Sequence, residues 1–315
     1  GELNECVALL REVLDALIAL KFQLVSEEVI QILMLLASVL GDGGHHVDDR
    51  LMQLYMDTLE SAREKLSDED EKLLLLTEML GKLLIGRGEM DGGLQMFSTL
   101  VDARRRALHR AKAAGGDREK VRKAGQKLCA DLHDVGRLCF YNERTFDADR
   151  YTSEARDLAT EHFGPRSEEA MSSMHQLSNA KLMLGRFGDA EALMREVLTT
   201  RRATFAAAEN RVEHLALQHT LMRTIAGLAN ILQMQGGHAA LLEAETLSRE
   251  AIELSTPLYG PSGKVTLSAK ALLRGVLARL RKRVPEMLAL TLELAFYGTP
   301  ATKDLKSTWL REDPD

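Results

Sequence analysis

The residues best suited to do chemistry lie in two short runs of this 315-residue chain. Residues 45–49 read His-His-Val-Asp-Asp and could offer metal ligands, but neighbours on one turn seldom converge on an ion without further partners. Residues 260–266 imitate a phosphate-binding loop. Leu258 stands where that loop requires glycine, however, and Val265 follows Lys264 where it requires Ser or Thr. The sequence therefore predicts no catalytic residue, no metal site and no cofactor, and we expect the protein not to be an enzyme.

The elements that would position functional side chains repeat along the chain. Residues 184–193 lie between two helical patterns, and weaker copies of this run lie on either side. Small residues mark the copies, because only a small side chain lets two helix backbones approach closely. One column of them reads Ala37, Gly81, Gly136, Ser178 and Ala229, a second reads Gly93, Ala148, Ala190 and Ala244, and a core column reads Leu36, Leu80, Val135, Leu177, Leu228 and Leu273. Such repetition predicts a solenoid of tight antiparallel helix pairs, which is a binding surface first of all.

Two landmarks support a common length for the repeats. The second small-residue column has intervals of 55, 42 and 54 residues, which fit a 42-residue unit with insertions of about a dozen residues. Gly164 and Gly260, each followed by proline, both lie thirteen residues before a core leucine and are 96 residues apart. Glycine commonly ends a helix and proline commonly begins the next one. The 96 residues between Gly164 and Gly260 equal the sum of the 42- and 54-residue intervals, so the glycine turns and the small-residue column indicate the same repeat length.

In these residues the chain resembles tetratricopeptide repeat (TPR) proteins of the kinesin light chain and nephrocystin type. The specific part of the match is about residues 165–280. It includes the run 184–193 and is preceded by the matching Gly164-Pro165 turn, while residues 30–165 match by spacing and small residues. The resemblance implies an all-α, right-handed superhelical solenoid of about six antiparallel helix pairs.

Within this solenoid we expect three parts. A capping helix is predicted over residues 1–21, the repeat array over 22–297 as one continuous domain, and a C-terminal tail over 298–315. The last unit departs from the repeat, since Arg274 and Glu286 replace small residues, and this is typical of a terminal cap with a polar outer face.

In TPR-like pairs the first helix lines the inner groove, and polar residues recur at the positions expected to face it. Asn and Gln both donate and accept hydrogen bonds, so Asn179 and Asn230 would hold the backbone of an extended peptide. Cationic side chains there would favour acidic groups. The expected peptide-binding residues are Lys82, His133, Asp134, Arg137, Tyr141, Ser172, His175, Gln176, Asn179, Arg223, Asn230 and Gln233.

Other interpretations of this face remain open. A polar face is also expected where a helix is simply solvated, and His133 and His175 are either pH-sensitive contacts or structural histidines. Kinesin light chain units usually carry two neighbouring Asn where this chain has His133-Asp134, His175-Gln176 and Ala226-Gly227. The ligand preference of that family therefore does not transfer.

Basic residues crowd the segment 104–127, although the net charge of the chain is −6. The negative net charge argues against a nucleic-acid partner. The basic segment is either a solvated surface or a docking patch for an acidic partner. The leading prediction is thus an adaptor that binds a protein or peptide, which could be acidic. The alternatives are a structural scaffold subunit that uses its outer ridges or residues 104–127, and a sensor domain of a longer regulatory protein.

Composition agrees with an intracellular helical protein. Apolar residues make up 45% and aromatic residues 4% of the chain, and six prolines are few for its length, which favours helix throughout. The longest apolar run, residues 29–40, is too short to cross a bilayer. Cys6, Cys129 and Cys139 are odd in number and lack zinc-finger spacing, so we expect reduced thiols and a cytoplasmic location. A targeting segment outside these residues stays open, and the oligomeric state is not predicted.

Overall fold

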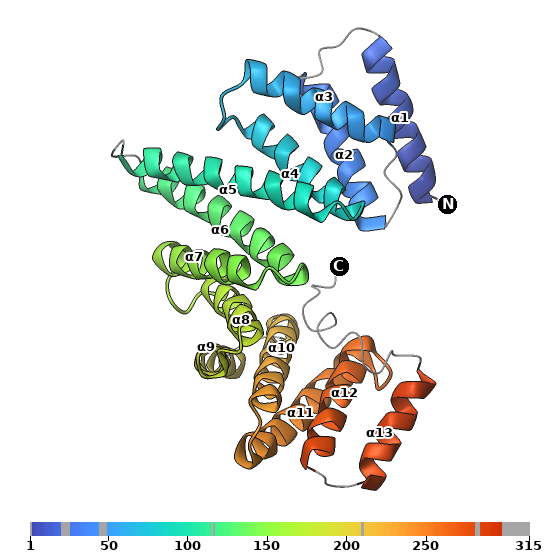
Figure 1. Ribbon diagram of the computed structural model, residues 1–315, viewed down its shortest axis with the longest axis vertical. Helices are drawn as coiled ribbons and strands as arrows, with labels where there is room; N and C mark the ends of the chain where they lie inside the picture. The colour runs from blue at the N-terminus through green and yellow to red at the C-terminus, as the bar shows by residue number, and fades with distance from the viewer. Residues whose placement is uncertain are drawn as a thin grey trace. The chain divides into compact units, whose positions relative to one another are not determined.

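The computed structural model describes residues 2–19, 26–43, 49–113, 115, 117–208, 211–280 and 284–297 (Figure 1). Over these residues the regular structure is entirely helical, which confirms the all-α prediction. The run 45–48 and the tail 298–315 lie outside the described residues. The helices are α1 (Glu2–Ala19), α2 (Glu27–Gly43), α3 (Asp49–Lys65), α4 (Glu71–Gly86), α5 (Met90–Ala113), α6 (Arg118–Tyr141), α7 (Thr145–Phe163), α8 (Glu168–Met183), α9 (Phe187–Ala206), α10 (Arg211–Gln235), α11 (His238–Tyr259), α12 (Lys264–Leu280) and α13 (Val284–Phe296).

The chain forms two compact units, Gly1–His162 and Phe163–Asp315. Within each unit most consecutive helices pack against each other, as α4 does with α5 and α10 with α11. That a single array runs continuously over residues 22–297 stays a prediction.

The small-residue columns mark the places where paired helices approach most closely. A Cβ atom added at Gly93 on α5 would lie 2.5 Å from Ile85 Cγ1 and 2.9 Å from the carbonyl oxygen of Gly81 on α4. In the second unit the Ser178 hydroxyl donates a hydrogen bond of 2.8 Å to the carbonyl oxygen of Ala190, across α8 and α9. The prediction of tight helix pairs is confirmed at both places.

The turns between the helices follow the glycine pattern. Gly164 and Gly260 have φ values of 94° and 76°, in the left-handed region that an L side chain rarely adopts. After the first of these turns, the Ser167 hydroxyl oxygen accepts a hydrogen bond of 3.1 Å from the Ala170 amide and so caps α8. The Gly-Pro landmarks therefore mark helix boundaries, as the sequence predicted.

A block of four helices occurs once in each unit. On α5, Arg104 donates hydrogen bonds to Glu71 on α4, at 2.8 and 3.1 Å, and to Asp131 on α6, at 3.2 Å. On α9, Arg201 does the same to Glu168 on α8 and, at 2.7 Å, to the Thr224 hydroxyl on α10. In both cases the glutamate lies 33 residues before the arginine.

A second set of ion pairs repeats in the same register. Arg105 on α5 pairs with Glu154 on α7, and Arg202 on α9 pairs with Glu250 on α11, over 49 and 48 residues. The block α4–α7 thus corresponds to α8–α11, with equivalent residues on α5 and α9 being 97 positions apart.

Apolar side chains are exposed on both end helices, although the sequence predicted a polar outer face for the last unit. Leu9 and Val13 on α1 are 61% and 48% exposed, and Leu288 and Leu292 on α13 are 56% and 63% exposed. The inner side of α13 packs through Leu290 against Leu273 and Leu277 of α12. The prediction of a polar outer face is therefore wrong for α13, because its leucines lie on both sides of the helix.

Candidate functional site

Seven of the predicted binding residues lie in the second unit, on two helices that contact each other. Ser172, His175, Gln176 and Asn179 lie on α8, and Arg223, Asn230 and Gln233 lie on α10. A Cβ atom added at Gly227 on α10 would lie 3.6 Å from His175 Cε1, and one added at Gly275 on α12 would lie 2.5 Å from Gln233 Nε2. The structure therefore brings these residues onto one series of neighbouring helices, which we call the α8–α10 face.

His175 is a structural residue of this face. Its side chain is only 7% exposed, and burial lowers its pKa well below the ordinary value, assisted by the positive charges of Arg223 and Arg201. The imidazole is therefore neutral at pH 7. Of the two interpretations that the sequence left open for His175, the structure favours the structural one.

The neighbouring polar side chains of the face have no internal partners. Among the described residues, none donates or accepts a hydrogen bond with the side chains of Gln176, Asn179, Arg223 or Asn230, and the Gln176 Oε1 atom is fully buried. Asn179 is 9% exposed, so its amide is sheltered but not enclosed. Leaving a sheltered amide without a hydrogen bond is unfavourable, and a ligand that forms hydrogen bonds with these amides would remove this cost on binding.

The five predicted residues in the first unit are in a different state. Lys82 pairs with Glu78 at 2.7 Å, and Arg137 pairs with Asp134 at 2.8 Å. Burial lowers the pKa of Lys82, but the hydrogen bond and charge of Glu78 outweigh it and raise the pKa above its ordinary value. His133 is half-buried, and Tyr141 is 38% exposed with its ring edge-on to Phe140. A single groove from Lys82 to Gln233 stays a prediction.

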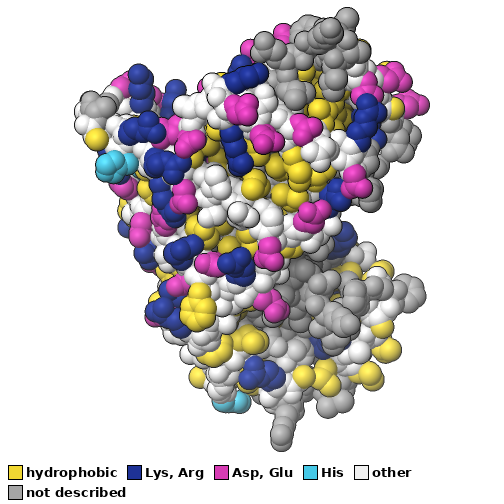
Figure 2. Space-filling model, turned by 45° about the horizontal axis from the view of Figure 1, so that its top comes forward, with side chains coloured by type: hydrophobic (Ala, Val, Ile, Leu, Met, Phe, Trp, Pro, Cys, Tyr) yellow, Lys and Arg dark blue, Asp and Glu magenta, His cyan; other side chains and the backbone are white. Residues whose placement is uncertain are grey.

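The basic segment 104–127 is largely neutralised within its own unit. In addition to the pairs of Arg104 and Arg105, Lys112 pairs with Glu161 and Lys127 pairs with Glu71, both at 2.7 Å. The carboxylates come from α4 and α7, on either side of the segment. Figure 2 shows Lys and Arg side chains interspersed with Asp and Glu, not gathered in one field. The segment therefore offers little uncompensated charge to an acidic partner.

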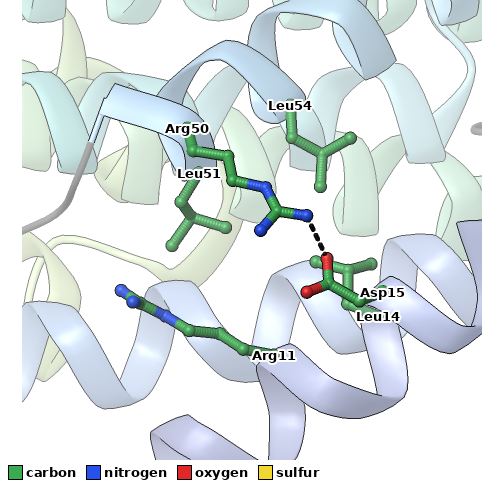
Figure 3. A pocket seen from close by; sticks show the side chains of 6 residues that line it. All are labelled: Arg11, Leu14, Asp15, Arg50, Leu51 and Leu54. Atoms are coloured by element: carbon green, nitrogen blue, oxygen red, sulfur yellow. Dashed lines mark hydrogen bonds and ion pairs between the residues drawn. The ribbon is translucent and has the colours of Figure 1, made fainter.

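Two cavities in the first unit were not predicted. One of about 80 Å³ lies between α1 and α3, where Arg50 reaches Asp15 at 2.7 Å (Figure 3). Another of about 270 Å³ lies between α5, α6 and α7 and is lined in part by Ser98, Cys139, Asp147 and Tyr151. The sequence feature that could have indicated the larger cavity is Ser98, a small residue at the position equivalent to Arg195, which lies 97 residues later.

The described residues contain no candidate metal site. No group of three His, Cys, Asp or Glu side chains among them could hold a metal ion. Cys129 and Cys139 are buried free thiols, and burial, reinforced by the negative charge of Asp147, raises the pKa of Cys139 to about 11. In the part of the chain described, no helix has the length and apolar character needed to span a bilayer.

The fold is shared with solved TPR-like proteins. No family model and no curated protein matches the chain. A putative kinesin light chain from Podosopora anserina with nearly identical TPR-like repeats is 16% identical, at a TM-score of 0.53 over 72% of this chain and 95% of that one. BtubC (BKLC) from P. vanneervenii is 15% identical, at a TM-score of 0.57 over 82% and 93%. NprR, solved in complex with its cognate peptide NprX, is 14% identical, at a TM-score of 0.52 over 94% and 75%. The chain therefore has the helical repeat fold of a TPR-type protein.

Proposed function

We propose that this protein is a non-enzymatic interaction module whose α8–α10 face binds an extended segment of a partner protein. The observation that supports this most strongly is the set of unpaired side chains formed by Gln176, Asn179, Arg223 and Asn230. Each amide can donate to and accept from the backbone of an extended peptide, whatever the sequence of that peptide. The structure of NprR with its peptide offers a precedent for this use of the fold.

Arg223 gives the face a preference for acidic peptides. It is half-buried and has no carboxylate partner among the described residues, in contrast to Lys82 and Arg137 of the first unit. A peptide carboxylate would form a charge-assisted hydrogen bond there. The buried free thiols of Cys129 and Cys139 support a reducing, cytoplasmic location.

A peptide display library selected on the whole chain tests the proposal. Selected peptides would be labelled, and their affinities measured by fluorescence polarisation for the wild type and for the double variant Asn179→Ala with Asn230→Ala. Two lost hydrogen bonds of about 1 kcal/mol each should weaken binding roughly 30-fold. Arg223→Gln should weaken acidic peptides selectively and reduce the dependence of affinity on salt.

The matched control is Lys82→Ala with Arg137→Ala, which alters the equivalent polar positions of the first unit. Circular dichroism would establish that both double variants keep their helicity. Failure to enrich any peptide, or equal affinity of the selected peptides for wild type and the Asn179/Asn230 double variant, would contradict the proposal. Loss of binding only in the Lys82/Arg137 variant would move the site to the first unit.

The scaffold alternative rests on one observation, the exposed leucines of the end helices. Leu288 and Leu292 on α13 lie one turn apart and form an apolar stripe. A scaffold would self-associate or join an assembly through such a stripe, and size-exclusion chromatography of Leu288→Lys with Leu292→Lys would detect this as a decrease in apparent mass.

A further inference from the structure

One of the differences between the two four-helix blocks lies at the cavity between α5, α6 and α7. In the second unit, Arg195 on α9 reaches across to Glu243 on α11 through two hydrogen bonds of 2.7 Å, and also to Glu191 at 2.8 Å. Its guanidinium therefore spans the two outer helices. The equivalent residue on α5 is Ser98, whose side chain is too short to reach α7. A space of about 270 Å³ remains between the helices there.

The carboxylate that would receive such a guanidinium is retained in the first unit. Asp147 on α7 occupies the position equivalent to Glu243 and lines the cavity. Arg144 and Arg150 contact it at 3.0 and 3.4 Å, but their side chains are 50% and 63% exposed, whereas that of Asp147 is 32% exposed. The carboxylate thus lies further inside than the two arginines, which border the opening.

The interior of the cavity also holds hydrogen-bonding groups without partners. Tyr151 is 5% exposed and lines the cavity, yet its hydroxyl makes no hydrogen bond with any described residue, and neither does that of Ser98. Cys139 lies at the buried side. After burial itself, the negative charge of Asp147 is the strongest influence on the Cys139 thiol, ahead of the positive charges of Arg144 and Arg150. The buried side of the cavity therefore faces a carboxylate and two neutral hydroxyl groups.

We infer that this cavity is a binding site for a guanidinium group, supplied by an arginine side chain of a partner protein. The bound group would lie where Arg195 lies in the second unit, with its planar fork directed at the Asp147 carboxylate and its remaining donors at Ser98 and Tyr151. An anion would have to lie beside Asp147 to reach the same hydroxyl groups, and Coulomb repulsion from that carboxylate opposes this, whereas Arg144 and Arg150 attract an anion only to the more exposed border of the cavity. The space greatly exceeds the roughly 30 Å³ that one water molecule occupies in the liquid, so a side chain can enter.

The inference is tested with Nα-acetyl-L-argininamide as the probe and its neutral isostere, Nα-acetyl-L-citrullinamide, as the control. Binding to the whole chain would be followed by amide chemical shifts in two-dimensional NMR spectra. The arginine probe should shift resonances of α5 and α7 saturably, and the citrulline probe should bind at least tenfold more weakly. Equal binding of the two probes, or binding of inorganic phosphate at these residues in place of the arginine probe, would overturn the inference.

The two copies of the block provide reciprocal variants. Ser98→Arg should fill the cavity from within and weaken probe binding at least tenfold, and Asp147→Asn should weaken it without filling the space. Arg195→Ser should open the equivalent space in the second unit, but Leu247 occupies the position equivalent to Tyr151 there, so the probe should bind more weakly than in the first unit. Unchanged binding in Ser98→Arg or Asp147→Asn would contradict the inference. Asn179→Ala with Asn230→Ala should leave this site intact, so failure of the peptide proposal and failure of this inference are distinguishable.

Discussion

The buried carboxylate of Asp131 should make the stability of the first unit depend on pH in an unusual direction. Burial raises the pKa of Asp131 from 3.8 to about 6, although the charge of Arg104 opposes this; Glu78 on α4 and Asp134 on α6 add to the increase. The folded protein therefore takes up a proton more readily than the unfolded chain does. Stability is gained as the pH falls through about 6 and lost as it rises, which is opposite to the behaviour of most paired carboxylates.

The size of the effect follows from the two pKa values. Between pH 7.5 and pH 5 a carboxyl group with a pKa of 3.8 when unfolded and about 6 when folded raises the free energy of unfolding by about 1.4 kcal/mol. Glu71 does not interfere in this range. The hydrogen bond from Arg104 lowers its pKa to about 2, so its stabilisation is present above pH 4.5 and lost only in stronger acid.

The assay is urea denaturation of the wild type and Asp131→Asn from pH 5 to 7.5, followed by circular dichroism. The difference in free energy of unfolding, variant minus wild type, cancels the contributions of all other titrating groups. It should fall by about 1.4 kcal/mol between pH 7.5 and 5. Asp157→Asn, at a side chain that is 68% exposed, is the control. A difference that is constant over this range would refute the reasoning, since it would mean that Arg104 outweighs the desolvation of Asp131.

Two further predictions concern packing and protonation. Gly93→Ala should destabilise the first unit by about 1 to 3 kcal/mol, because the added Cβ atom would lie 2.9 Å from the backbone oxygen of Gly81. The control Gly188→Ala should have no such effect, because no atom lies within 4 Å of its added Cβ atom. Thermal denaturation of both variants tests this prediction. His175 should show no imidazole titration by NMR between pH 6 and 8, and a chemical-shift midpoint near 6.5 would contradict its burial. Because the pKa of His175 is lower in the folded state than in the unfolded chain, the second unit should lose stability as the pH falls below 6.5.

The fold was predictable because the small residues of the repeat lie where the backbones of paired helices come close together. Gly81, Gly93 and Ser178 lie where two helices leave no room for a larger side chain, and this requirement is visible as small residues at a regular spacing. The Gly164 turn was visible for the same reason, since its φ value suits glycine. The polarity of the end helices was not predictable in this way, because exposure depends on what packs outside a helix and not on its repeat.

The candidate site was predictable in part. The distance in sequence from the core column predicted that Asn179 and Arg223 lie on neighbouring helices. It did not predict the burial of His175, because α8 is covered on more than one side. The basic segment was misleading for a different reason. The partners of Arg105 and Lys112 lie 49 residues away on α7, and a linear count of charges does not detect pairing over that distance.

The paired arginines Arg104 and Arg201 have a consequence for how such a chain can grow or be shortened. Each guanidinium needs a carboxylate on the helix before it and a polar group on the helix after it, while the equivalent positions on α7 and α11 hold Ala159 and Ser255. Duplication or deletion of the whole four-helix block keeps every buried guanidinium supplied with partners. Adding or removing a single helix pair places a buried arginine beside a helix pair that lacks the carboxylate or the polar group it needs. The repeating unit of these contacts is thus about 97 residues long, so engineered duplications and truncations should be tolerated in steps of that size.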